Sequence, residues 1–186
     1  HIPAKHRQLI RTFLDEADMS ADAIKTVDFP PACGADIVVS CEKAKDRKNG
    51  SIYLKPTQFV LGIGCRRDTA FENIDSAIRQ SLLKLQIDIS DIDMIASIDV
   101  KKDEPGIKEF CDRNRIEFVT YTADELMAVQ GEFSASQFVK EHVGVDNVCE
   151  RAAVLACSRE CNKAGQLIYK KHKYDGVTVA AAKYPD

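Results

Sequence analysis

Two arginines follow a glycine turn within residues 59–69, and this combination can bind an anion. An apolar run leads into Gly62 and Gly64, and Arg66 and Arg67 come directly before an expected helix. Glycine lets the backbone approach a ligand closely, and free N–H groups at a helix N-terminus favour negative charge. Arginine adds planar donors for a carboxylate or phosphate. The same residues also suit a plain strand-to-helix turn with solvated arginines, and Arg67 stands where a dinucleotide fingerprint needs its third glycine.

The cysteines of the chain favour reduced thiols in a cytoplasmic protein. There are seven of them, an odd count, and no Cys-x-x-Cys pair occurs, which argues against a disulfide framework. Cys157 and Cys161 are one helical turn apart, but no histidine lies near them, so we predict no metal site. Cys65 would need a partner such as His142 or His172 to act as a nucleophile, and a packing role suits it better.

Two carboxylates are candidates for acid–base chemistry. Glu104 closes the segment 99–104, which also carries Lys101, and Glu150 lies near the start of a later helix. A carboxylate becomes a useful acid or base when burial raises its pKa, and Lys101 could pair with a carboxylate of the ligand. Acidic residues in a first helical turn also stabilise the helix dipole, so both positions have a purely structural alternative.

The elements that must position these residues alternate regularly from residue 57 onward. Apolar stretches predict strands at 59–63, 94–98, 117–121, 166–171 and 176–182. Local signals predict the helix starts: Thr69 with Glu72 and Thr122 with Glu125 match a capping box, and Pro105 suits a first helical position. Further helices are expected at 136–142 and from residue 146 or 147. The side chains expected to face inward are Phe71, Ile74, Ile78, Leu82, Leu85, Ile107, Phe110, Cys111, Val148, Ala152 and Leu155.

This alternation predicts an α/β fold with a mostly parallel sheet and helices on both faces. Asp175-Gly176 predicts an antiparallel hairpin between the last two strands. In such sheets ligands bind outside the carboxyl ends of the strands. We therefore expect the loops 64–68, 99–104 and 120–124 to meet at one edge, joined by residues 146–150 if that helix points the same way.

Residues 1–56 lack the regular alternation of strands and helices seen in the rest of the chain, and we expect them to form a short α/β appendage. They combine a helical stripe before Asp18, short strands at 36–40 and 51–54, and a charged loop at 41–50. We expect them to be the remnant of a preceding middle region or a linker, with the main domain at 57–186. The chain starts without methionine, which suggests that it begins inside a longer protein or keeps residues left by cloning.

Composition narrows the class of protein. The chain has 186 residues, of which 45% are hydrophobic and 30% charged, so a substantial core can form. The net charge of −3 offers no broad basic surface for nucleic acid, and no apolar run is long enough to cross a membrane. Any anion site must therefore be local.

Four blocks of the sequence, in order across about residues 59–183, resemble the C-terminal domain of CbiG and its single-domain relative CobE, a family of cobalamin-biosynthesis proteins. They are Gly62-Ile63-Gly64-Cys65-Arg66-Arg67, the block from Ser97 to Gly106, the block from Val143 to Ala153, and Lys170-Lys171 with Asp175 to Ala180. One departure is Asp68, which stands where the family usually has glycine.

The resemblance implies hydrolysis of cobalt-precorrin-5A in the anaerobic route to vitamin B12, with lactone opening and release of acetaldehyde. Water is the co-substrate, no organic cofactor is implied, and cobalt travels with the substrate. The implied partners are the cobalt-precorrin tetrapyrrole and other enzymes of the corrinoid pathway. Glu104 and Glu150 are the candidate acid–base residues. The candidate substrate-binding residues are Gly62, Gly64, Cys65, Arg66, Arg67, Thr69, Lys101 and Lys171.

Three alternatives stay open at this point. The nearest is a CobE-like module that binds a corrinoid intermediate without hydrolysing it. A second is a phosphate- or nucleotide-binding protein that uses the same turn, although the chain has neither a Walker lysine–serine pair nor an intact GxGxxG. A third is a non-catalytic interaction domain whose charged loops dock a partner.

Overall fold

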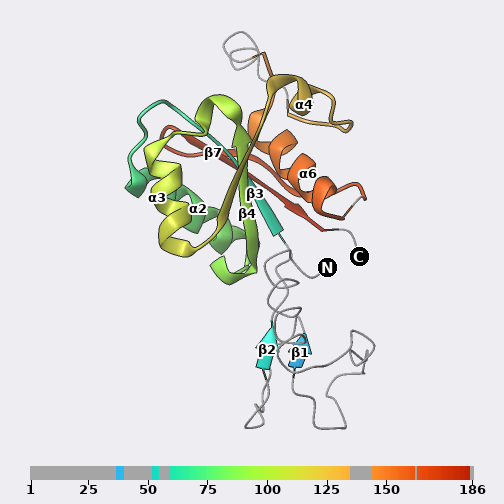
Figure 1. The fold of residues 1–186 in the computed structure, drawn as a ribbon. Helices are drawn as coiled ribbons and strands as arrows, with labels where there is room; N and C mark the ends of the chain where they lie inside the picture. The colour runs from blue at the N-terminus through green and yellow to red at the C-terminus, as the bar shows by residue number, and fades with distance from the viewer. Residues whose placement is uncertain (1–36, 40–51, 55–58, 135–143, 162, 185–186) are drawn as a thin grey trace. The chain divides into compact units, whose positions relative to one another are not determined.

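The computed structural model describes residues 37–39, 52–54, 59–134, 144–161 and 163–184, and it divides into two compact units (Figure 1). The units are His1–Thr57 and Gln58–Asp186. In the first unit, β1 (Ile37–Val39) and β2 (Ile52–Leu54) pair in parallel, and they fall within the two strands predicted there. The helix predicted before residue 18, the charged loop at 41–50 and the helix at 136–142 lie outside the described residues.

The second unit is built on a five-stranded sheet with the order β5-β4-β3-β7-β6. β3 pairs in parallel with β4, and β4 with β5, whereas β7 pairs antiparallel with both β3 and β6. The predicted α/β class and the C-terminal hairpin are confirmed. The strands are β3 (Phe59–Cys65), β4 (Ile92–Ile98), β5 (Glu117–Tyr121), β6 (Gln166–Lys173) and β7 (Val177–Lys183).

Helices cover both faces of this sheet, as predicted (Figure 1). α2 (Phe71–Leu85) and α3 (Pro105–Asn114) pack on one face, where the predicted inward residues of both helices join the core. α6 (Val148–Cys161) packs on the other face, with α4 (Ala123–Met127) beside it. Short 3-10 turns, η2 (Ile89–Asp91) and η3 (Asp99–Lys101), lie at the two ends of β4. Among the described residues no helix is long and apolar enough to cross a membrane.

The two predicted capping boxes have different outcomes. Thr122 and Glu125 form theirs, each side chain accepting from the other's backbone N–H. The box of Thr69 and Glu72 was a wrong prediction, because α2 begins after Ala70 without a side-chain cap. The Thr69 N–H, which a capping box would direct to Glu72, donates to the Glu104 carboxylate, and the Thr69 hydroxyl donates to the carbonyl of Arg66.

α6 begins at Val148, one residue after the later of the two predicted starts, and Asn147 caps it. The Asn147 side-chain oxygen accepts from the N–H of Glu150 at 2.9 Å. Val148 and Ala152 are buried and Leu155 is half-buried, in line with the predicted inward face. The first turn of α6 packs directly on β3, since a Cβ at Gly62 would collide with the Cys149 carbonyl oxygen.

Candidate functional site

The carboxyl ends of the parallel strands gather the predicted loops at one edge of the sheet, which we call the strand-end edge. The loops after β3, β4 and β5 all leave there because these strands are parallel. α6 starts over Gly62 and approaches Gly165 with its later turns, so its N-terminus also points to this edge. The N–H of Arg66 donates to the Gly176 carbonyl at 3.0 Å and brings in the β6–β7 turn. The predicted convergence of these segments is therefore confirmed.

Glu104 joins the loop after β3 to the loop after β4. Its side chain is 4% exposed; one oxygen accepts from the Thr69 N–H at 3.1 Å, and the other lies 2.7 Å from the Lys101 ammonium nitrogen. Two residues on, Gly106 lets the start of α3 approach the backbone of Thr69, because a side chain there would strike the Thr69 carbonyl oxygen. The anion held beside the N-terminus of α2 is thus a carboxylate of the protein itself.

Cys65 lies next to this ion pair and is half-buried. Burial raises the pKa of its thiol, and the nearby Lys101 ammonium and a hydrogen bond from Thr69 only partly offset that effect. The thiol is therefore mostly protonated near neutral pH. This state suits the packing role predicted for Cys65 better than nucleophilic attack.

Glu150 is fully buried and its carboxylate is surrounded by donors. One oxygen accepts from the Lys171 N–H at 2.6 Å and the Ser134 hydroxyl at 2.8 Å, and the other accepts from the Ser134 N–H at 2.8 Å. Burial opposes ionisation, but these hydrogen bonds outweigh it and hold the pKa of Glu150 below its usual value. A carboxyl with a lowered pKa is a weaker base, and this one fastens α6 to β6 and to the segment before residue 135.

Lys171 contributes its backbone to that arrangement, and its ammonium nitrogen lies 3.4 Å from the Ser134 carbonyl oxygen. Asn147 donates to the same carbonyl at 2.8 Å. Every polar group of Ser134 is therefore engaged. Sequence reasoning missed Ser134, because nothing local marks a serine whose partners lie 13 to 37 positions away.

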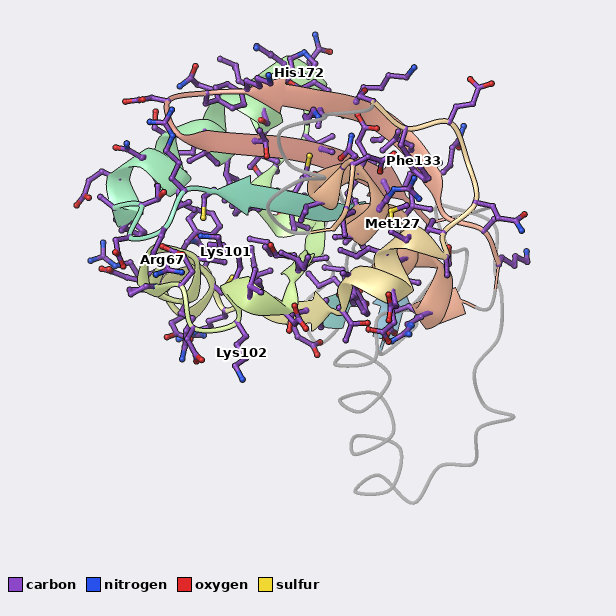
Figure 2. The ribbon with its side chains drawn as sticks, turned by 90° about the horizontal axis from the view of Figure 1, so that it is seen from above. Arg67, Lys101, Lys102, Met127, Phe133 and His172 are labelled. Atoms are coloured by element: carbon purple, nitrogen blue, oxygen red, sulfur yellow. The ribbon has the colours of Figure 1, made fainter. Side chains whose placement is uncertain are left out.

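Arg66, Arg67 and Lys102 remain as exposed cations, and none has a carboxylate partner among the described residues. Figure 2 shows Arg67, Lys101 and Lys102 on one side of the view, with Met127 and Phe133 on the other. Asp68 sits among these cations with φ +58°, a left-handed conformation that favours glycine. This explains physically why glycine suits the position.

The two glycines of the predicted site have different surroundings. Gly62 is buried beneath the first turn of α6, so the lack of a side chain there serves helix packing. Gly64 is half-buried, and its carbonyl accepts from the Thr178 hydroxyl at 3.1 Å. The structure therefore brings together Gly64, Cys65, Arg66, Thr69, Lys101 and Glu104 in one cluster, while Glu150 and Lys171 form a second one around Ser134. Over the described part of the chain, no group of three or more potential metal ligands occurs.

The fold and this edge define the class: an α/β protein with a local cationic site at the carboxyl ends of its parallel strands. Residues 59–182 match the family described as "Cobalamin synthesis G C-terminus", and with this match over most of its length the chain belongs to that family.

Two curated relatives are similar over most of this chain. The chain is 35% identical over 126 residues to the cobalt-precorrin-5A hydrolase of Salmonella typhimurium, covering 68% of this chain and 34% of the relative. It is 33% identical over 137 residues to the probable cobalt-precorrin-5A hydrolase of Methanocaldococcus jannaschii, covering 71% and 42%. The chain thus spans about a third to two fifths of the length of these relatives.

A solved structure agrees with this assignment. The crystal structure of CobE, a protein from the cobalamin biosynthetic pathway, superposes with a TM-score of 0.65 at 25% identity. The superposition covers 69% of this chain and 92% of CobE.

Proposed function

We propose that this chain acts in cobalamin biosynthesis and hydrolyses cobalt-precorrin-5A. The observation that carries the proposal is the family match together with the identity to relatives named as hydrolases of that compound. In the proposed reaction water opens the lactone of the contracted macrocycle, and a two-carbon fragment leaves as acetaldehyde. The chain spans only part of those relatives. We propose that the reaction takes place in this part, at the strand-end edge.

The exposed cations of the edge support binding of such a substrate. A cobalt-precorrin is a flat ring edged with carboxylates, and Arg66, Arg67 and Lys102 can each pair with one of them. Lys101 is less available for this purpose, since its ammonium group is already paired with Glu104 at 2.7 Å. We propose that the three exposed cations bind the ring, whereas the buried pair of Lys101 and Glu104 stabilises the loops.

Lactone opening places negative charge on the former carbonyl oxygen, and backbone N–H groups can stabilise that charge. In the loop after β3 the N–H groups of Arg66 and Thr69 already have acceptors. Those of Arg67 and Asp68 have no acceptor among the described residues, and we propose them as the donors. The cobalt is part of the substrate in this scheme.

The cellular compartment and the partner enzymes are part of the same proposal. The four cysteines whose side chains are described are free thiols, which supports a reducing compartment such as the cytoplasm. Enzymes that make and consume the corrinoid intermediate are the expected partners, because the chain would receive its substrate from one and pass its product to another.

The direct test is to incubate the purified chain with cobalt-precorrin-5A without oxygen and to measure acetaldehyde. We expect release, and we expect Arg66→Ala to lower kcat/KM by about 10- to 100-fold, the loss of one charge-assisted hydrogen bond. Arg79→Ala is the control, because Arg79 pairs with Asp75 on the surface of α2. No acetaldehyde from the folded wild-type chain would contradict hydrolysis by this region.

A second candidate is a corrinoid-binding module without hydrolase activity. The superposition on CobE, which covers nearly all of that protein, favours it. Binding of cobalt-precorrin-5A at the strand-end edge without acetaldehyde release would support this candidate over hydrolysis.

A further inference from the structure

Asp99 is the first residue after β4, and its backbone is held firmly at the strand-end edge. Two residues earlier, the Ser97 hydroxyl donates to the Ile63 carbonyl at 2.7 Å and fastens β4 to β3. The Asp99 carbonyl accepts from the Lys102 N–H at 3.0 Å and closes the η3 turn. Asp99 begins the η3 turn, which ends at Lys101, the ion-pair partner of Glu104. Asp99 is therefore part of the same short turn as Lys101, which contributes to the cluster around Glu104.

The Asp99 carboxylate combines two properties: it is half-buried, and it has no hydrogen-bond or ion-pair partner among the described residues. Glu104 and Glu150 have both oxygens occupied by donors. Asp103 is on the surface, with a side chain that is 76% exposed. Asp68 is exposed beside the arginines. Asp99 alone among these is half-buried and also free of a hydrogen bond or ion pair within the described part of the chain.

These surroundings decide which carboxylate can accept a proton from water. Glu104 and Glu150 are buried, so a water molecule reaches their oxygens less readily than it reaches the oxygens of the half-buried Asp99. Asp99 can accept a proton without breaking any contact. It also lies two residues from Lys101, in the same loop as the exposed cation Lys102.

We propose that Asp99 is the general base of the lactone hydrolysis, an inference that rests on the proposed function. Its carboxylate takes a proton from water as the water oxygen bonds to the lactone carbonyl carbon. The tetrahedral intermediate then breaks its bond to the ring oxygen, and the proton on Asp99 passes to that oxygen to give an alcohol and a carboxylic acid. When the alcohol loses its proton to Asp99, the adjacent carbon–carbon bond breaks, the macrocycle takes the electron pair and a proton, and acetaldehyde leaves.

The test compares Asp99→Asn with Asp103→Asn, which removes the same charge from the same loop. Acetaldehyde release and binding of cobalt-precorrin-5A, followed by absorbance, are measured separately for the wild-type chain and both variants. Asp99→Asn should lower kcat by about 10²–10⁴-fold, the usual contribution of a general base, and should leave binding within about 3-fold. Asp103→Asn should keep wild-type turnover. Asp99→Glu, which restores a carboxylate, should recover part of the lost rate.

The pH profile separates a base from a merely structural residue. If Asp99 is the base, an acid limb in the wild-type pH–rate profile should be absent from the residual rate of Asp99→Asn. Near-normal turnover by folded Asp99→Asn, or a loss confined to binding, would overturn the role of Asp99 and leave the proposed function standing. Absence of turnover in the wild-type chain would instead overturn the proposed function, and the role of Asp99 with it.

Discussion

Glu104 and Glu150 are both buried carboxylates, but the protein stabilises them by different means. Glu104 has a cation, Lys101, on one oxygen and a backbone N–H on the other. Glu150 accepts three hydrogen bonds from Ser134 and Lys171, and no ion pair to it occurs among the described residues. A buried charge is therefore satisfied at one place by a counter-ion and at the other by neutral donors.

The difference separates two structural tasks. The Glu104 carboxylate joins the two loops that carry the exposed cations through its hydrogen bond from the Thr69 N–H, and Lys101 is its counter-ion within the loop after β4. The donors around Glu150 join α6 to β6 and to Ser134, so that carboxylate holds distant segments of the chain together. Removal of Glu104 and removal of Glu150 should therefore lower the free energy of unfolding by different amounts.

The largest effect should come from Glu150→Ala. The change leaves the N–H groups of Ser134 and Lys171 and the Ser134 hydroxyl without their acceptor in a buried site, and we expect a loss of about 3–5 kcal/mol in the free energy of unfolding. Urea denaturation measures it. Glu109→Ala is the control, because Glu109 pairs with Arg113 on the surface and should cost less than about 1 kcal/mol. Equal losses in the two variants would contradict the account of Glu150.

The ion pair should give a smaller and strongly coupled effect. Lys101→Met leaves the Glu104 carboxylate buried without its counter-ion, and we expect a loss of about 2–4 kcal/mol. Adding Glu104→Gln removes the uncompensated charge and should recover part of that loss. A double-mutant cycle measures the coupling, and strictly additive losses would show that Lys101 and Glu104 do not stabilise each other.

Acid should weaken the fold through Glu150. Because the folded-state pKa of this carboxyl is lowered, its stabilising contribution is present above the ordinary pKa of 4.5 and is lost as the pH falls through the folded value. Unfolding free energies measured from pH 7 down to about pH 3 should therefore decline below pH 4.5. Glu150→Gln should be less stable at neutral pH and should decline less on acidification. An unchanged acid slope would place the source of the decline elsewhere.

The smallest effect should come from Asp68→Gly. Glycine relieves the strain of φ +58° but adds freedom to the unfolded chain, so stability should change by less than about 1 kcal/mol. Removal of a negative charge beside the arginines should tighten binding of an anionic ligand by a few-fold. Weaker binding by the glycine variant would show that the Asp68 carboxylate contributes to the site.

Local patterns predicted the elements well, but they could not reveal which distant groups compete for the same atoms. Thr69 with Glu72 and Thr122 with Glu125 match the same capping pattern, yet only the second forms it. The difference is Glu104, 35 positions from Thr69, which takes the Thr69 N–H.

The site was predicted in part, for the same reason. Parallel strands must bring their carboxyl ends together, so the rule that places ligands at strand ends predicted which loops meet. It could not show that the carboxylates of Glu104 and Glu150 accept hydrogen bonds from groups inside the protein, or that Gly62 allows α6 to pack on β3. The hairpin was visible from Asp175-Gly176, but the insertion of β7 beside β3 depends on contacts far apart in the sequence.

The central claim is that the exposed cations of the strand-end edge bind the substrate, and a titration tests it most directly. Cobalt-precorrin-5A is added without oxygen to the wild-type chain, to Arg66→Ala/Arg67→Ala, and to Arg113→Ala/Arg115→Asn, which removes two guanidinium groups at the end of α3. The account predicts that the first variant raises Kd by at least about 10-fold, an effect that weakens with added salt, while the second binds like wild type. Equal affinity in all three proteins would contradict it.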